Sequence, residues 1–130
     1  MKVYQRWNYK QAPDFLFETD KEIDIGEVIK YCNRHYVVCS LDQKNGIAEI
    51  RLLKNFTNLN AVLQRRAEEY SDSYELICPV CVERIDDEPR EPDMIECPHC
   101  GAELQVDVEY VVYYSPVVMR VPLVKDLDEE

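Results

Sequence analysis

The first half of the chain has three short β-favouring runs, at residues 28–32, 35–41 and 47–53, and in the third Ala48, Ile50 and Leu52 alternate with Glu49 and Arg51. Period-two alternation over this length is typical of β-strands. Residues 33–34 can form a two-residue turn, and residues 42–46, which end in Asn-Gly, carry a strong hairpin signal. We therefore predict an antiparallel meander. Three strands alone cannot bury both of their faces, so we expect a small barrel or a sheet that other elements cover.

Residues 59–71 are predicted to form one helix, because their apolar residues recur three and four positions apart. These residues are Leu59, Val62, Leu63, Ala67 and Tyr70. Asn58 or Asn60 can cap the N-terminus of this helix through its side chain. The charged residues of the segment are expected to face water.

The longest alternating pattern runs over residues 104–114 and predicts one long strand with a single apolar face. We expect Pro116 to end this strand. Residues 117–124 form a second apolar run, and Pro122 favours an edge position for any strand there. The last residues, 125–130, are acidic and are expected to fray.

Four cysteines carry the clearest chemical signal in the sequence. They occur as Cys78-Pro79-Val80-Cys81 and Cys97-Pro98-His99-Cys100-Gly101, with fifteen residues between the two pairs. Two intervening residues let a tight turn aim both sulfurs of a pair at one point, and zinc takes four such ligands in a tetrahedron. Proline stiffens the turn, and Gly101 suits a left-handed exit from it. The spacing therefore predicts a metal site, whereas two matched turns within 23 residues are not typical of ordinary buried thiols.

Residues 74–115 resemble the zinc-ribbon family, whose rubredoxin-like knuckles carry the same CPxC turns. The resemblance implies that Cys78, Cys81, Cys97 and Cys100 bind one structural Zn²⁺ in a closed site, which leaves no position for water or substrate. Iron can bind the same ligands, but rubredoxins have a longer spacing between their pairs and more aromatic cores. One departure is Val82, because many members of the family have glycine after the first pair. Such a match defines structure better than function.

The fold class is accordingly mostly β (α+β): a small antiparallel β-unit with one helix, plus a four-cysteine zinc ribbon. We expect residues 1–56 to form the N-terminal antiparallel β-unit and residues 57–73 the connecting helix. Residues 74–115 then form the zinc ribbon with its long strand, and residues 116–130 a C-terminal edge segment and acidic tail. No other part of the chain resembles a known family.

Cys32, His35 and Cys39 suggest a second metal site, but no fourth ligand lies near them in the sequence. We expect two buried thiols and a histidine close to a turn. His99 lies inside the second knuckle, where four cysteines already complete the tetrahedron. Its side chain is therefore expected to point outward, where it can contact a partner.

The net charge of −11 is unevenly distributed, with +1 over residues 1–60 and −12 over residues 61–130. A bound zinc tetrathiolate adds −2, which brings the second part to −14 and the chain to −13. Such a surface repels the phosphates of DNA and RNA. The one cationic and aromatic segment, residues 1–10, offers either a stacking platform around Trp7 or a first strand whose aromatic residues pack on the sheet.

The loop between the two cysteine pairs is strongly acidic and is the candidate surface for a protein partner. Its candidate residues are Glu83, Asp86, Asp87, Glu88, Glu91 and Asp93. Rows of carboxylates can imitate the charge of nucleic acid and occupy basic grooves. The chain offers no nucleophile–base set and no glycine-rich phosphate loop, since it has two histidines and three glycines. We therefore expect a binding protein and not an enzyme.

The preferred hypothesis is a small acidic zinc-ribbon adaptor or inhibitor of another protein, such as a nucleic-acid enzyme with a basic groove. In size and charge it is similar in style to accessory proteins of bacteriophages. The first alternative is a nucleic-acid-binding ribbon of a transcription or replication factor. The second is a structural component of a virion or complex, with the apolar residues 111–114 as an oligomer seam. The N-terminus has no apolar signal-peptide region and no run reaches ~18 apolar residues, so we expect a cytoplasmic, reducing compartment without membrane contact.

Overall fold

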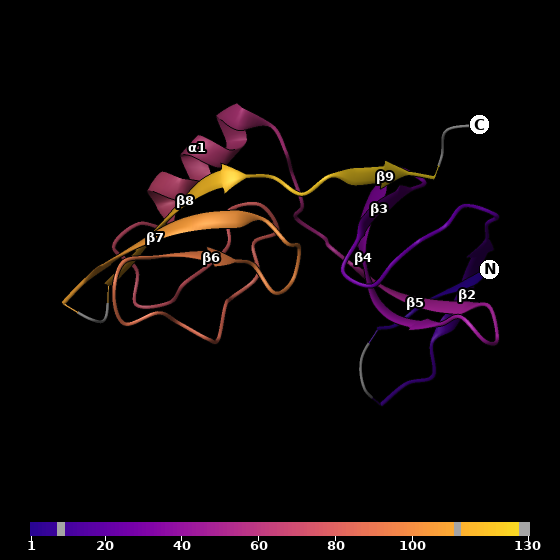
Figure 1. Cartoon of the computed structure of the whole chain (residues 1–130). Coiled ribbons are helices and arrows are strands. Elements are labelled where there is room, and N and C mark those ends of the chain that lie inside the picture. The colour runs from indigo at the N-terminus through magenta and orange to yellow at the C-terminus, as the bar shows by residue number, and fades with distance from the viewer. Residues whose placement is uncertain (8–9, 111–112, 128–130) are drawn as a thin grey trace. The chain divides into compact units, whose positions relative to one another are not determined.

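A computed structural model describes residues 1–7, 10–110 and 113–127 (Figure 1). Within these residues the protein is mostly β, with 43% of them in strands and bridges, two sheets and a single short helix, as the sequence predicts. The chain forms two compact units. Unit 1 comprises residues 1–54 and 123–130, and unit 2 comprises residues 55–122. The four cysteines of the motif all belong to unit 2.

Unit 1 is built on one six-stranded sheet with the strand order β2-β1-β5-β4-β3-β9. Its strands are β1 (Lys2–Gln5), β2 (Asp14–Glu18), β3 (Val28–Tyr31), β4 (Arg34–Asp42), β5 (Ile47–Leu52) and β9 (Val124–Asp126). The predicted meander is the antiparallel centre, β3-β4-β5. The sheet is extended by two parallel pairings that local patterns do not reveal, β1 with β5 and β3 with β9. One cluster of buried side chains, from Val3 to Ile50, forms the core of the unit.

The turn between β3 and β4 lies one residue earlier than the sequence predicts. Cys32 and Asn33 form it, with φ angles of 51° and 62°. Two consecutive positive φ angles are the geometry that matches the twist of a two-residue hairpin, and asparagine tolerates it well. The shift moves Cys32 out of the strand and onto the exposed tip of the hairpin.

Unit 2 contains the helix and a three-stranded antiparallel sheet with the order β6-β7-β8. Its elements are α1 (Asn60–Glu69), β6 (Asp93–Glu96), β7 (Glu103–Glu109) and β8 (Tyr113–Arg120). The helix lies beside β8 (Figure 1). Leu63 is the buried residue of this helix, as its position in the apolar pattern requires.

The prediction of one long strand over residues 104–114 is wrong. β7 ends at Glu109, Tyr110 has a φ of 56°, and β8 returns antiparallel to β7 from Tyr113. Val111 and Val112, part of the predicted oligomer seam, lie outside the described residues. The alternation continues through this hairpin because its turn carries no glycine, proline or asparagine. Pro116, the predicted end, lies within β8, where an edge strand tolerates proline.

The core of unit 2 is small. Its buried apolar side chains outside the cysteines are Leu63, Leu76, Val80, Ile85, Ala102, Leu104, Val106 and Tyr114. The four cysteines are as buried as these residues. Domains with so little core usually depend on a metal or on disulfides for stability. We therefore expect the folding of unit 2 to depend on these four buried cysteines.

Candidate metal centre

The first cysteine pair lies at the tip of a short hairpin. Ile77 and Arg84 form an antiparallel bridge at its base. The Cys78 N–H donates to the Glu83 carbonyl at 3.0 Å, and the Val82 N–H donates to the Cys78 carbonyl at 2.8 Å. These two bonds close a tight turn that holds the sulfurs of its two cysteines on the same side.

The second pair repeats this turn. The Cys97 N–H donates to the Ala102 carbonyl at 2.8 Å, and the Gly101 N–H donates to the Cys97 carbonyl at 2.9 Å. The donor and acceptor offsets are identical to those of the first turn. The exit residues also correspond, because Val82 has a φ of 57° and Gly101 a φ of 82°. Val82, which stands where many zinc ribbons have glycine, therefore leaves the turn geometry intact. Its left-handed conformation is strained, because its side chain is β-branched.

The two turns face one another and bring the four sulfurs together. All four Sγ atoms lie within 4.8 Å of one another, and the Cys78–Cys100 and Cys81–Cys97 separations are both 3.8 Å. A disulfide requires about 2.05 Å, so the pairs are not bonded. A regular tetrahedron with Zn–S distances of about 2.3 Å has S···S edges of about 3.8 Å. The cluster therefore fits one tetrahedral thiolate-bound metal ion.

The pKa values of the cysteine thiols depend on one another, because the four sulfurs lie together in one buried space. Hydrogen bonds from neighbouring thiols, Cys100 first, lower the pKa of Cys97. Hydrogen bonds with the other sulfurs, followed by burial, raise the pKa of Cys81. The pKa of Cys100 is raised too, first by its bond with Cys78. Four thiolates cannot coexist at these distances without a cation, and metal binding would release the remaining protons.

His99 connects the two turns without joining the sulfur cluster. Its Nε2–H donates to the Arg84 carbonyl at 2.9 Å, and its backbone N–H donates to Cys97 Sγ at 3.4 Å. A carbonyl only accepts, so this contact requires the tautomer that carries the proton on Nε2. His99 thus points away from the metal position, as expected, and fastens the second knuckle to the first.

The remaining candidates do not form a second site. Across the described ranges, the four-cysteine cluster is the one group of three or more potential ligands whose donor atoms converge. Cys32 and Cys39 are exposed, so the prediction that both thiols are buried is wrong. Lys30, and not Cys32, lies opposite His35. The Cys39 thiol donates to the Glu49 carbonyl at 3.3 Å, and partial burial raises its pKa.

The N-terminal aromatic segment is a strand whose side chains have contacts within unit 1. Tyr4 meets Phe15 edge to face, with ring centroids 5.5 Å apart. The Trp7 indole N–H donates to Asp14 at 2.9 Å. Arg6 pairs with Glu49 at 2.8 Å. Tyr4 in β1 thus packs as expected of a first strand, whereas Trp7 lies beyond the strand and is 55% exposed, and Tyr9 lies outside the described residues.

The acidic loop between the knuckles is mostly exposed but is partly neutralised from within. Asp86, Asp87, Glu91 and Asp93 are exposed, and Glu83 and Glu88 are half-buried. The Arg84 guanidinium lies 3.7 Å from Glu75, 3.7 Å from Asp86 and 4.0 Å from Glu88. The charge that this loop presents to a partner is therefore smaller than the sequence alone suggests.

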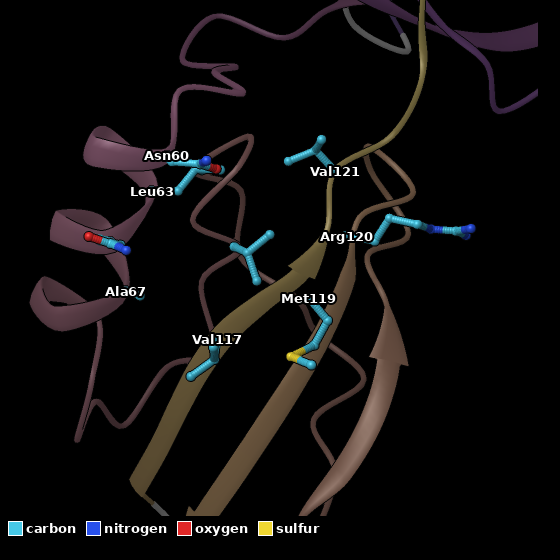
Figure 2. A pocket seen from close by; sticks show the side chains of 9 residues that line it. Asn60, Leu63, Ala67, Val117, Met119, Arg120 and Val121 are labelled. Atoms are coloured by element: carbon cyan, nitrogen blue, oxygen red, sulfur yellow. The ribbon is translucent and has the colours of Figure 1, made fainter.

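A groove of about 460 Å³ lies between α1 and β8 (Figure 2). Leu63 and Ala67 line it from the helix, and residues 117–121 line it from the strand side. Its lining contains no cysteine, histidine or carboxylate. The sequence pattern does not reveal this groove, because it depends on the return of β8 beside the helix.

The chain matches no protein-family model, no curated protein and no solved structure. Within residues 1–7, 10–110 and 113–127, no helix is long and apolar enough to span a membrane. The functional assignment therefore depends on the cysteine cluster and on the surfaces around it.

Proposed function

We propose that this chain is a zinc-binding protein in which one structural Zn²⁺, held by Cys78, Cys81, Cys97 and Cys100, keeps unit 2 folded. The observation that carries the proposal is the set of four buried sulfurs with edges of 3.8 Å. Two knuckles with identical hydrogen bonding place them there. Four protein ligands complete the tetrahedron, so the metal has a structural role and no open position for catalysis.

We further propose that unit 2 binds a basic protein partner as an adaptor or inhibitor. Fourteen carboxylates and five Lys or Arg side chains give residues 55–122 a formal charge of −9, and a zinc tetrathiolate would bring this to −11. Charge of this sign attracts basic grooves, such as those of polymerases and nucleases, and repels nucleic acid itself. The acidic loop remains the candidate contact surface, through Glu83, Asp86, Asp87, Glu88, Glu91 and Asp93.

The metal is tested by elemental analysis of protein purified without added zinc. We expect about one zinc per chain, and we expect a chelator to unfold unit 2, because binding and folding are coupled in such sites. Changing Cys97 and Cys100 to serine should abolish both the metal and the fold of unit 2. The matched control changes the exposed Cys32 and Cys39 to serine and should keep one zinc. Iron with a visible absorption band would instead indicate electron transfer, and a folded protein without metal would overturn the proposal.

The partner role is tested with the zinc-loaded chain immobilised on a support. We expect it to retain a basic protein from cell extract and to release it as the salt concentration rises. Replacing the six loop carboxylates by their amides should reduce this retention. A shift of duplex DNA by the free chain, with a steep salt dependence, would instead support the nucleic-acid-binding alternative.

A further inference from the structure

Unit 2 carries a group of three tyrosines at the end of its β7–β8 hairpin. Tyr74 and Tyr110 are 68% and 79% exposed. The rings of Tyr74 and Tyr113 have centroids 4.8 Å apart and their hydroxyls are 2.9 Å apart, while Tyr110 meets Tyr113 nearly edge-on at 6.3 Å. The three rings therefore form one exposed aromatic cluster drawn from three separate segments.

The backbone fixes this cluster in place. Ser73 and Tyr114 form an isolated antiparallel bridge, with N–H···O distances of 3.2 Å and 2.8 Å. This bridge holds Tyr74 beside Tyr113 although 39 positions separate them. Exposed tyrosines that are held rigidly offer a large contact area at little entropic cost, and tyrosine is enriched in protein interfaces.

Carboxylates surround the cluster. Glu109 is the direct cross-strand partner of Tyr113, and Asp107 is the partner of Ser115. Cross-strand partners place their side chains on the same face of a sheet, about 4.5–5.5 Å apart at Cβ. Ser115 also bonds to Asp72, whose N–H donates to its hydroxyl at 3.0 Å. Among the described residues, no Lys or Arg forms an ion pair with Asp72, Asp107 or Glu109.

The same strand continues from the cluster to the groove beside α1. Val117 lines the groove and is 48% exposed, and Met119, also in its lining, is 56% exposed (Figure 2). Val117 follows Tyr113 by four residues, or about 13 Å at the rise of a strand. An apolar anchoring position thus lies at a defined distance from the tyrosine cluster.

We propose that this surface, formed by Tyr74, Tyr110, Tyr113, Asp107, Glu109 and the groove, binds an extended Lys- or Arg-containing segment of a partner protein. The cation lies against the tyrosine rings and carboxylates, which both attract positive charge. An apolar side chain about four residues away fills the groove. The inference rests on the proposed function, since it adds to the acidic loop a second surface, at which unit 2 binds a separate, extended segment of a basic partner.

Charge and backbone geometry favour a basic protein segment over a second copy of the chain, a nucleic acid or an added β-strand. A second copy would bring a second set of the same carboxylates against the surface, and nucleic acid would bring phosphates against it; both are repelled. Addition of a strand to the edge of β8 is also disfavoured. Pro116 has no N–H to donate, and the backbone of Tyr114 is already bonded to Ser73. Recognition therefore depends on side chains.

The experiment follows the amide NMR spectrum of the zinc-loaded full chain during titration with three synthetic peptides. The first, GRTSTLTG, places arginine and leucine four residues apart; the second, GRLTSTTG, places them side by side; the third replaces the arginine of the first by glutamate. We expect saturable shifts centred on Tyr74, Tyr110, Tyr113 and Val117 with the first peptide. We expect at least fivefold weaker binding of the second and no binding of the third.

Variants locate the surface. Tyr74→Ala with Tyr110→Ala should weaken binding of the first peptide at least fivefold, whereas Trp7→Ala, which removes an exposed aromatic residue of unit 1, should not change it. Asp107→Asn with Glu109→Gln should weaken binding, and the control pair Asp20→Asn with Glu22→Gln, which removes the same charge, should not. All four variants alter exposed side chains, and their spectra report directly whether each remains folded.

Four outcomes would overturn the inference. The first is an equal loss of peptide affinity in the control variants, and the second is a set of peptide-induced amide shifts centred on loop residues 83–93. The third is saturable binding of a ten-nucleotide oligo-dT at the tyrosines. The fourth is a set of amide shifts at the tyrosines that depend on protein concentration without peptide. The third would point to nucleic acid and the fourth to a second copy. Failure of the proposed function is separate, because it appears as absent zinc or absent capture of a basic protein by the unaltered chain.

Discussion

The matched turns of the two knuckles permit a direct test of backbone strain. Val82 and Gly101 occupy equivalent exit positions with φ angles of 57° and 82°. A left-handed conformation costs a non-glycine residue roughly 1–2 kcal/mol. Glycine avoids this cost but loses about 0.5–1 kcal/mol through the greater entropy of the unfolded chain. The sign of the change in stability can therefore be calculated for each of the two substitutions, valine for Gly101 and glycine for Val82.

Gly101→Val should destabilise unit 2 by about 1 kcal/mol, the strain less the entropy returned. The added Cβ itself meets no steric conflict, because it would lie 3.8 Å from a Glu96 side-chain oxygen, which is ordinary van der Waals contact. Val82→Gly loses the packing of a half-buried side chain, on the order of 1 kcal/mol, as well as backbone entropy. Relief of strain offsets these losses, so this variant should stay within about 0.5 kcal/mol of the original protein.

The assay is competition for zinc between the protein and a chelator of known affinity, because folding of unit 2 and metal binding are coupled. A loss of 1 kcal/mol weakens the apparent zinc affinity about fivefold. We expect this for Gly101→Val and a change of less than about twofold for Val82→Gly. A neutral Gly101→Val variant, or a Val82→Gly variant weakened more than tenfold, would refute the argument that both exits require the same left-handed conformation.

Three further predictions concern the rest of the structure. Leu104→Ala, at a fully buried position in unit 2, should cost about 2–5 kcal/mol, measured by urea unfolding of the zinc-loaded chain; a loss below 1 kcal/mol would contradict this packing. Arg84→Gln removes three exposed ion pairs and should cost less than about 1 kcal/mol, while zinc stoichiometry stays at one. Partial burial, and then Lys30, lower the pKa of His35 below 6.5. The unfolded chain therefore binds more protons just below that pH, and stability of unit 1 should fall as the pH drops through this window; an NMR titration of His35 with a pKa above 6.5 would exclude this.

The elements that the sequence predicted correctly are those fixed by local signals. The Asn-Gly turn defines the β4–β5 hairpin, and helical spacing around Leu63 defines α1 within one or two residues at each end. The cysteine spacing identified the four residues whose sulfurs converge, because each CPxC turn is a self-contained structure. The four cysteines of the metal site could thus be predicted from the sequence, whereas the surfaces around them could not.

The missed features depend on contacts between distant segments. β1 and β9 pair in parallel with strands 40 or more residues away, and no local sequence pattern specifies such a distant strand partner. The β7–β8 hairpin was missed because the apolar alternation continues through its turn, where Tyr110 adopts a positive φ without glycine. The tyrosine cluster was invisible for the same reason, since it exists only when β8 returns beside Tyr74.

The metal and the exposed surfaces of unit 2 are connected by one physical argument. A sheet of three short strands and one helix buries too few apolar side chains to hold a long polar insertion in place. The two knuckles hold both ends of the acidic loop and Ile85 anchors it in the core, so its other residues can remain charged. Tyr74 lies four residues before Cys78 and is held against the β7–β8 hairpin by the Ser73–Tyr114 bridge. We therefore expect zinc binding to be the condition for presenting the tyrosines and carboxylates in one arrangement, so that the proposed binding of a basic partner would depend on a metal ion that the partner does not contact.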